Sequence, residues 1–268
     1  MANKALIAGN WKMNTTLDSA QELIRDLLKQ IPPDVNADIA VYPPFTVLYQ
    51  LGELLKDSVV ALGAQDLFWE EKGAYTGEIS AAQIRDSGAT LVLAGHSERR
   101  HVIGEDNETV HRKVMAALKG RLDACLCVGE KQEQRESGQT SDIVQSQLKS
   151  GLKDVDPSDI SKVTIAYEPV WAIGTGLTAT PEQAQEVHLF IRKLLKELYG
   201  EKAGEIRILY GGSAKPQNAA QLLSMPDVDG LLVGGASLDA ESFAGIINAA
   251  GSSTAAWGGK LPYMKNRA

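Results

Sequence analysis

The sequence has few cysteines, no long apolar run and no excess of basic residues. Among its 268 residues only Cys125 and Cys127 are cysteines, and without a second Cys/His cluster a zinc site is not expected. We interpret both as packed thiols, which is typical of a reducing compartment. No segment approaches the roughly 18 consecutive apolar residues of a membrane span, and the run from Ala5 to Ala8 is too short for a signal-peptide core. We therefore expect a cytoplasmic protein that does not interact with membranes.

The charge and the length narrow the class further. A formal net charge of -7 disfavours a protein that binds the phosphate backbone of nucleic acids. A hydrophobic fraction of 44% is ordinary for a soluble globular protein. The body of the chain contains no linker, no low-complexity segment and no repeat, and α/β barrels of about 200 to 250 residues commonly form one domain. A single large domain is the simplest expectation.

Short apolar segments alternate with helical patterns along the chain. Because the segments are mostly apolar throughout, they are typical of a parallel sheet covered by helices. Eight such α/β units close into a (β/α)8 barrel or form an open doubly wound sheet, and the lack of a G-x-G-x-x-G motif weakens the second option. The eight predicted strands are 5–8, 38–42, 59–62, 90–94, 124–128, 163–166, 207–210 and 230–233.

Two helices are especially clear. Thr180 begins a capping box with Gln183, and Pro181 occupies the first helical position. Apolar residues follow helical spacing in both covering helices and predict their buried faces. These residues are Leu17, Ala20, Leu23, Ile24, Leu27, Leu28 and Ile31 in the first helix, and Ala184, Val187, Ile191, Leu194, Leu195 and Leu198 in the second.

A carboxylate and an apolar loop follow the sixth predicted strand. Glu168 comes at the strand end, and Pro169 forces a break in the backbone there. The apolar segment 170–173 suits a lid that expels water from a small site, and Gly174 permits close approach to a ligand. These features favour a catalytic base beneath a lid, although a helix acid followed by an ordinary surface loop fits this segment equally well.

Further polar and glycine residues follow other predicted strands. Asn10 and Lys12 come after the first strand, and His96 comes after the fourth, where a following helix N-terminus would disfavour its protonation. Glycine pairs at 211–212 and 234–235 follow the last two strands, the usual place of phosphate-binding loops in barrel enzymes. Each feature alone also fits a solvated lysine, a structural histidine or a simple turn.

Together these segments closely resemble the triosephosphate isomerase family over about residues 5 to 250. The resemblance implies a closed (β/α)8 TIM barrel of eight parallel strands, with residues 1–250 as a single catalytic domain and residues 251–268 as a C-terminal extension. Five motifs carry it in the family's order: Asn-Trp-Lys-Met-Asn at 10–14, Gly-His-Ser-Glu-Arg-Arg at 95–100, Tyr-Glu-Pro-Val-Trp-Ala-Ile-Gly-Thr-Gly at 167–176, Tyr-Gly-Gly-Ser at 210–213 and Leu-Val-Gly-Gly-Ala-Ser-Leu at 232–238.

The resemblance also implies an activity and roles for the residues. The family interconverts dihydroxyacetone phosphate and D-glyceraldehyde 3-phosphate without a cofactor or a metal. Glu168 would be the base, made more basic by desolvation under the lid. His96 and Lys12 would stabilise the enediolate oxygens with help from Asn10. Glu98 would pair with Lys12, although it also suits the first turn of a helix.

Other roles concern the phosphate, the lid and assembly. Tyr210 resembles the residue that latches the closed lid. The segment 73–78 resembles the loop through which Thr76 reaches a partner's site in a homodimer, although without the resemblance it would be read as a hairpin turn. The chain departs from the family pattern at Asp66, where Asn is usual, and across 68–72. Backbone N–H groups of Gly174, Ser213, Gly234 and Gly235 would bind the phosphate, while Ile173 and Leu232 would press on the reacting carbons.

Two other functions fit parts of the sequence. A different phosphate-binding barrel enzyme, such as a sugar-phosphate aldolase, would need a Schiff-base lysine deep in a strand, and the context of Lys12 does not supply one. A non-catalytic barrel that binds metabolites would have no need of Glu168, His96 and Lys12 together. The sequence therefore favours an isomerase of triose phosphates.

Overall fold

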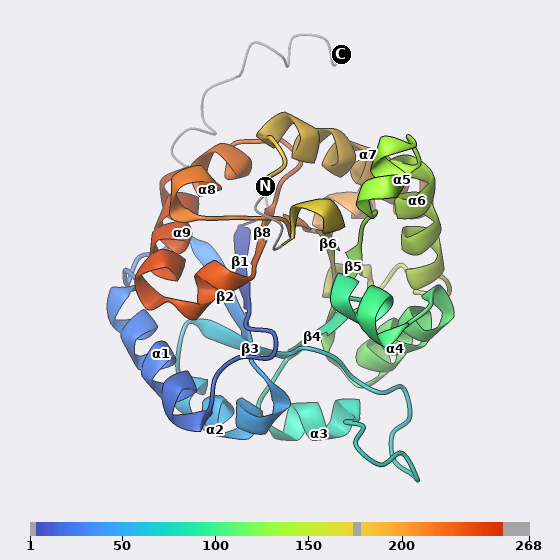
Figure 1. Cartoon of the computed structure of the whole chain (residues 1–268). Helices are drawn as coiled ribbons and strands as arrows, with labels where there is room; N and C mark the ends of the chain where they lie inside the picture. The colour runs from blue at the N-terminus through green and yellow to red at the C-terminus, as the bar shows by residue number, and fades with distance from the viewer. Residues whose placement is uncertain (1–3, 174–177, 254–268) are drawn as a thin grey trace.

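The computed structural model describes residues 4–173 and 178–253, which form a closed parallel barrel surrounded by helices (Figure 1). Each strand pairs with its neighbour in the sequence, and β1 closes the ring by pairing with β8. Closure excludes the open doubly wound sheet and confirms the predicted (β/α)8 fold. The strands are β1 (Ala5–Asn10), β2 (Ala37–Tyr42), β3 (Val60–Ala64), β4 (Leu91–Ala94), β5 (Asp123–Val128), β6 (Val163–Tyr167), β7 (Ile208–Tyr210) and β8 (Gly230–Val233).

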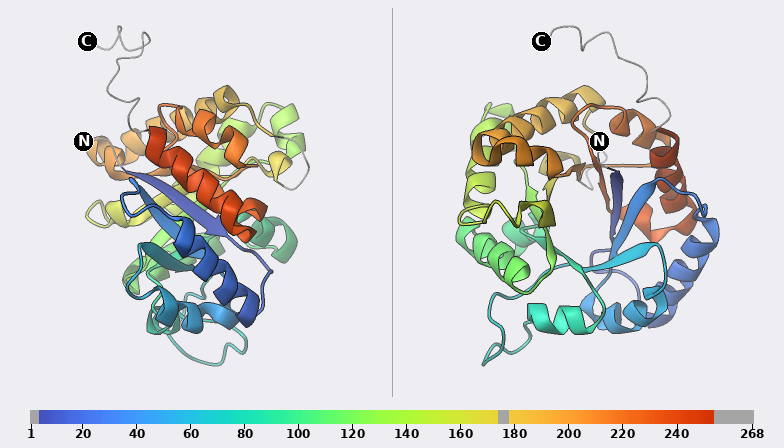
Figure 2. Two further views of the ribbon diagram at one scale, coloured as in Figure 1. Left: turned by 90° about the vertical axis from the view of Figure 1, so that its left-hand side faces the viewer. Right: turned by 180° about the vertical axis from the view of Figure 1, so that it is seen from behind.

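Helices cover the outside of the barrel in chain order. In the side view α9 lies beside α1, so the last and first helices meet where the ring closes (Figure 2). None of the helices within residues 4–173 and 178–253 is long and apolar enough to cross a bilayer. The helices are α1 (Leu17–Gln30), α2 (Phe45–Leu55), α3 (Ala81–Asp86), α4 (Asn107–Lys119), α5 (Gln132–Glu136), α6 (Thr140–Gly151), α7 (Pro181–Tyr199), α8 (Pro216–Leu223) and α9 (Ala240–Ser253), with the short helical turns η1 (Arg99–Ile103), η2 (Ile160–Lys162), η3 (Val170–Ala172), η4 (Gly200–Glu205) and η5 (Gly235–Leu238).

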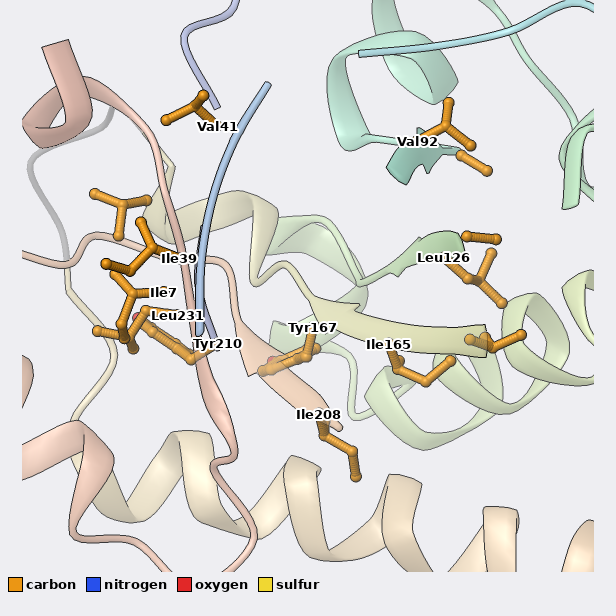
Figure 3. Packing of buried hydrophobic residues seen from close by; sticks show 14 of the residues in the cluster. Ile7, Ile39, Val41, Val92, Leu126, Ile165, Tyr167, Ile208, Tyr210 and Leu231 are labelled. Carbon is orange, nitrogen blue, oxygen red and sulfur yellow. The ribbon is translucent and has the colours of Figure 1, made fainter. Parts of the chain in front are cut away.

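The core has two layers separated by the strands. A small inner cluster fills the barrel and contains Cys125 and Cys127, both buried free thiols on the same face of β5, as predicted. A much larger cluster lies between the strands and the helices, and Figure 3 shows part of it, including Tyr167 and Tyr210. The alternation of side chains along each strand therefore assigns them in turn to the two layers.

The predicted start of α7 agrees with the structure, but two predicted core positions are wrong. Thr180 caps α7 and exchanges hydrogen bonds with Gln183, as the capping box predicted. Leu17 is 38% exposed and Leu198 is 43% exposed, so neither belongs to the core. Leu17 is the first residue of α1, and Leu198 lies in the last turn of α7. The 19-residue helix α7 is longer than the five-residue strand β6 that precedes it, so its last turn extends past the end of the strand.

Candidate active site

A cavity of about 360 Å³ opens at the carboxyl ends of the strands. Loops after β1, β4, β6, β7 and β8 supply its walls, so side chains far apart in the sequence meet there, as expected for this end of a barrel. Its lining includes Asn10, Lys12, His96, Glu168, Ile173, Leu232, Gly234 and Gly235, together with residues 211–215.

The loop after β1 presents the ammonium group of Lys12 to the cavity. Lys12 has a φ of 54°, an unusual left-handed conformation for a residue other than glycine. Its backbone N–H donates to Oδ1 of Asn10 at 3.0 Å, and its carbonyl accepts from the Gln65 amide at 2.8 Å. Nζ of Lys12 donates to Oε1 of Glu98 at 2.7 Å, so the predicted pair is confirmed. A strained backbone held by surrounding hydrogen bonds is typical of a functional site.

Glu168 and His96 are in direct contact. The Glu168 side chain is 2% exposed, and its Oε1 lies 2.9 Å from Nε2 of His96. Its Oε2 accepts the backbone N–H of Ser97 at 2.8 Å. The backbone N–H of Glu98 donates to Nδ1 of His96 at 3.3 Å, so Nδ1 is an acceptor. The neutral imidazole therefore carries its proton on Nε2, the nitrogen that faces the carboxylate.

This contact decides the protonation of both groups. Burial lowers the pKa of His96, but the charge and hydrogen bond of Glu168 outweigh burial and hold the pKa above its ordinary value. Burial raises the pKa of Glu168, but His96 and the Ser97 N–H outweigh burial and lower it. Both sequence-based directions are therefore wrong for this arrangement. The Glu168 carboxylate, at hydrogen-bond distance, affects the pKa of His96 more than a helix end does. The same contact stabilises Glu168 as the anion.

Glycines next to Glu168 leave the space that its backbone and side chain occupy. A side chain at Gly129 would put its Cβ 1.7 Å from the Glu168 carbonyl, and one at Gly211 would put it 2.9 Å from Cγ of Glu168. A side chain at Gly212 would put its Cβ 2.2 Å from the Tyr210 hydroxyl. The glycines at the ends of β5 and β7 therefore let the backbone and side chain of Glu168 sit close against neighbouring strands.

Comparison with known proteins agrees with this geometry. A sequence model of the family described as triosephosphate isomerase matches residues 5–250. The triosephosphate isomerase of Moorella thermoacetica is 51% identical over 245 residues, which cover 91% of this chain and 98% of that protein. The chain belongs to the triosephosphate isomerase family. Proteins of the same name from Chloroherpeton thalassium and Aquifex aeolicus are 51% and 48% identical, over 92% and 91% of this chain and 99% and 98% of their own.

Not every residue that the family resemblance singled out lines the cavity. Ser213, Leu232, Gly234, Gly235 and Ile173 do, whereas Gly174 lies outside the described residues. Thr76 is exposed in the loop that protrudes before α3 (Figure 1). Tyr210 is fully buried, and burial raises its pKa to about 12. Its hydroxyl has no hydrogen-bond partner among the described residues.

One buried carboxylate near the cavity is not among the predicted site residues. Glu130 is fully buried and follows β5, and its carboxylate accepts from the Tyr167 hydroxyl at 3.1 Å and from Nε1 of Trp171 at 3.0 Å. The Arg135 guanidinium lies 4.7 Å above the Trp171 ring. Glu130 thus links the end of β6 to the helical turn η3. Its position directly after an apolar strand was the available signal, the same one that drew attention to Glu168.

The described part of the site offers no metal centre. Within residues 4–173 and 178–253, no group of three or more His, Cys, Asp or Glu side chains is placed to hold an ion. The polar side chains that line the cavity instead carry a carboxylate, an imidazole, two ammonium groups, a hydroxyl and amides. This set suits proton transfer next to a carbonyl, with the charge on oxygen stabilised by hydrogen bonds.

Proposed function

We propose that this chain interconverts dihydroxyacetone phosphate and D-glyceraldehyde 3-phosphate, with Glu168 as the base that moves a proton between C1 and C2. The proposal rests on one arrangement. Glu168, His96 and Lys12 all line a single cavity. Glu168 is 2% exposed and His96 is 5% exposed. A buried base beside two donors fits removal of a proton from a carbon next to a carbonyl, since charge develops on the oxygen as the proton leaves.

Substrate binding would reverse the pKa directions of the pair. To reach a substrate carbon, the Glu168 carboxylate must leave Ser97 and His96, which now supply the contacts that lower its pKa. Burial would then dominate and raise the pKa of Glu168, making it a stronger base. His96 would lose the contact that raises its own pKa. A neutral imidazole would then donate Nε2–H to the substrate oxygen.

Lys12 and Asn10 would also stabilise the substrate oxygens on which negative charge develops, and Glu98 would hold Lys12 in place. The Lys12 ammonium is the cation of the cavity lining nearest to Gly234, where an added Cβ would lie 3.6 Å from Cε of Lys12. The ammonium would attract the anionic substrate and stabilise the enediolate. Backbone N–H groups of Gly174, Ser213, Gly234 and Gly235 would bind the phosphate, with Ile173 and Leu232 against the reacting carbons.

The lid would protect the intermediate. An enediolate next to a phosphate ester can break the C–O bond, releasing inorganic phosphate with the bonding electron pair and leaving the enol of methylglyoxal. Closure over the cavity would exclude water and hold the phosphate in the plane that resists this loss. Tyr210 would latch the closed lid at Ala179, and Glu130 anchors its first turn through Trp171.

We also propose a homodimer in which Thr76 completes the partner's site. The exposed large apolar side chains within residues 4–173 and 178–253 support it, because seven of these nine follow the carboxyl ends of β1 to β4 and so lie in one sector of the barrel. A sector of this kind on a soluble protein is typical of an interface. The seven are Met13, Leu17, Phe45, Tyr49, Tyr75, Val102 and Ile103.

The remaining expectations concern location and partners. A cytoplasmic enzyme is in keeping with the two free thiols in the barrel. The net charge of -7 favours neither nucleic acid nor anionic membranes as partners. The partners would then be the triose phosphate and a second copy of the chain.

A coupled assay that reports glycerol 3-phosphate formation from glyceraldehyde 3-phosphate tests the activity. We expect Glu168→Gln to lower kcat by at least about 10²-fold, because the amide keeps the size but cannot take the proton. Lys12→Met should strongly lower kcat/KM, because the ammonium group that attracts the substrate and stabilises the enediolate is lost. Glu201→Gln, a matched change at a 96% exposed side chain, should have no effect. Near wild-type kcat in Glu168→Gln would remove Glu168 as the base.

Sedimentation tests the assembly. Shortening the segment 73–78 should give monomers of weak activity, because the loop would no longer reach a partner. A wild-type chain that sediments as a fully active monomer would refute the dimer.

A further inference from the structure

A buried amide on α6, which the proposed chemistry does not use, is hydrogen-bonded to the backbone beside Glu168. The side chain belongs to Gln147, which is 9% exposed. Its Oε1 accepts the backbone N–H of Gly129 at 2.7 Å, and its Nε2 donates to the carbonyl of the same residue at 3.1 Å. One side chain therefore satisfies both backbone polar groups of Gly129, as a neighbouring strand would.

Gly129 depends on this amide because β4 ends before the chain that follows β5 does. The N–H of Asp123, at the start of β5, donates to the carbonyl of Thr90 on the β4 side. Gly129 lies an even number of residues further along, so its backbone groups face the same side. β4 ends at Ala94, whose register partner lies three residues before Gly129, and so offers it no partner. Gln147 occupies the place of the missing strand.

The backbone of the proposed base lies directly against Gly129. A Cβ at Gly129 would lie 1.7 Å from the carbonyl oxygen of Glu168. The N–H of Glu168 donates to the carbonyl of Val128 at 2.8 Å, and the N–H of Val170 donates to that of Glu130 at 3.1 Å. The residues on both sides of Gly129 thus hold the segment that carries the base. A shift of Gly129 would therefore move Glu168.

We propose that Gln147 is a positioning residue for the base: its amide holds Gly129 in line with β5, and Gly129 holds the backbone of Glu168. This inference rests on the proposed role of Glu168 and extends it to a residue that is not among the described residues lining the cavity. Loss of the amide would leave two buried backbone groups unpaired, and the Gly129 peptide would move to find other partners.

The expected loss concerns kcat and not KM. A displacement of about 1 Å can cost about 10²-fold in rate, and for a smaller shift of Glu168 we expect about 10-fold. The groups proposed to bind the phosphate at Ser213, Gly234 and Gly235 follow β7 and β8, whereas β5 pairs only with β4 and β6. Substrate binding should therefore change little when Gly129 moves.

Two substitutions remove the contact and a third serves as the control. Gln147→Met keeps the length of the side chain but loses both hydrogen bonds. Gln147→Asn keeps an amide, but the side chain is one methylene group too short to reach Gly129. Val144→Ala is the matched control, because Val144 lies three residues earlier on the same face of α6 and is 0% exposed. It weakens the packing of α6 without removing a hydrogen bond to Gly129.

The readout is kcat and KM in the isomerisation assay, at a temperature where circular dichroism shows each variant to be folded. We expect Gln147→Met and Gln147→Asn to lower kcat by about 10-fold and to keep KM within about 3-fold of wild type. Val144→Ala should keep both constants within about 2-fold, even though it should unfold at a lower urea concentration.

Several results would overturn the inference. A folded Gln147→Met variant with kcat within about 2-fold of wild type would do so, as would an equal loss of kcat in Val144→Ala or a loss confined to KM. If Gln147→Met does not fold, a folded Gln147→Asn variant with unchanged kcat would refute the role of the amide. Failure of the proposed function is recognised separately, because the wild-type protein would then not isomerise the triose phosphates or Glu168→Gln would keep its kcat.

Discussion

Asp66 should weaken this protein at neutral pH, and its replacement by Asn should stabilise it. The side chain is 7% exposed and belongs to a buried cluster of two carboxylates and two cations. Nζ of Lys113 lies 2.6 Å from Asp66 and 2.5 Å from Glu105. The Arg99 guanidinium lies 2.9 Å from Asp66 and 2.6 Å from Glu105. Both cations therefore keep Glu105 as a partner when Asp66 loses its charge.

The size of the effect follows from the pKa of Asp66. Burial, together with the charge of Glu105, outweighs the cations and raises the pKa from 3.8 to about 6. The difference of about 2.2 units, at 1.36 kcal/mol for each unit, corresponds to about 3 kcal/mol. Because the folded pKa is the higher one, the native state binds the proton more tightly. Stability is thus greatest below about pH 4 for this group and is lost as pH rises through about 6.

Urea unfolding of Asp66→Asn and wild type at one protein concentration, between pH 5 and pH 8, measures this effect. We expect the variant to be more stable by up to about 3 kcal/mol at pH 8 and by clearly less at pH 5. Asp34→Asn, at an exposed carboxylate, should give a small difference that does not change over this range. An Asp66→Asn variant that is less stable than wild type at pH 8 would refute the reasoning, since it would mean that the ion pairs outweigh burial.

Three further predictions concern backbone space, capping and acid stability. Gly129→Ala would place Cβ 1.7 Å from the Glu168 carbonyl, so kcat should fall by at least about 10-fold while circular dichroism shows a folded barrel. Thr180→Ala removes the side chain that accepts from Gln183 at the start of α7, and urea unfolding should show a loss of about 1 kcal/mol, whereas Thr180→Ser should restore it. His188 has a pKa lowered from 6.5 to about 4, so unfolding takes up a proton in this window and His188 should cost up to about 3 kcal/mol of stability as pH drops from 6.5 to 4. Because Asp66 acts in the opposite direction, the measure is the difference in stability between wild type and His188→Phe, and a difference that does not change with pH would contradict this.

Much of the barrel could be predicted because its strands are short, apolar and separated by helical patterns. All eight strands lie where the sequence placed them, with ends that differ by at most two residues. The largest extensions occur at β1, which continues through Gly9 and Asn10, and at β3, which continues through Gly63 and Ala64. Glycine and Asn have low strand propensity, so local preference ended these strands early, whereas pairing around the closed barrel extends them.

The site was predictable in its members but not in its contacts. Placement at strand ends and the family motifs identified Glu168, His96 and Lys12, which the structure brings to one cavity. The 2.9 Å contact between Glu168 and His96 depends on the curvature that brings the ends of β4 and β6 together, and no pattern along the chain encodes it. The direction of both pKa shifts depends on this contact, which explains why expectations from burial and a helix end were wrong.

The part played by buried polar residues was harder to predict. Glu130 and His188 are both 0% exposed. Local patterns point to their burial, since Glu130 follows an apolar strand and position 188 falls on the buried face of α7, but no pattern identifies the partners of these polar groups. His188 even lies one residue after Val187 on the buried side of α7, where an apolar residue is expected. Only the structure shows their contacts with Tyr167, Tyr210 and Asp227.

The most direct test of the central claim is proton NMR of the reaction in D₂O. If Glu168 carries the proton through an enediolate, the dihydroxyacetone phosphate formed from glyceraldehyde 3-phosphate should contain solvent deuterium at C1, and recovered substrate should contain it at C2. Glu168→Gln should abolish this exchange, while Glu201→Gln should not. Product that forms at the wild-type rate without deuterium, or exchange that persists in Glu168→Gln, would contradict the account.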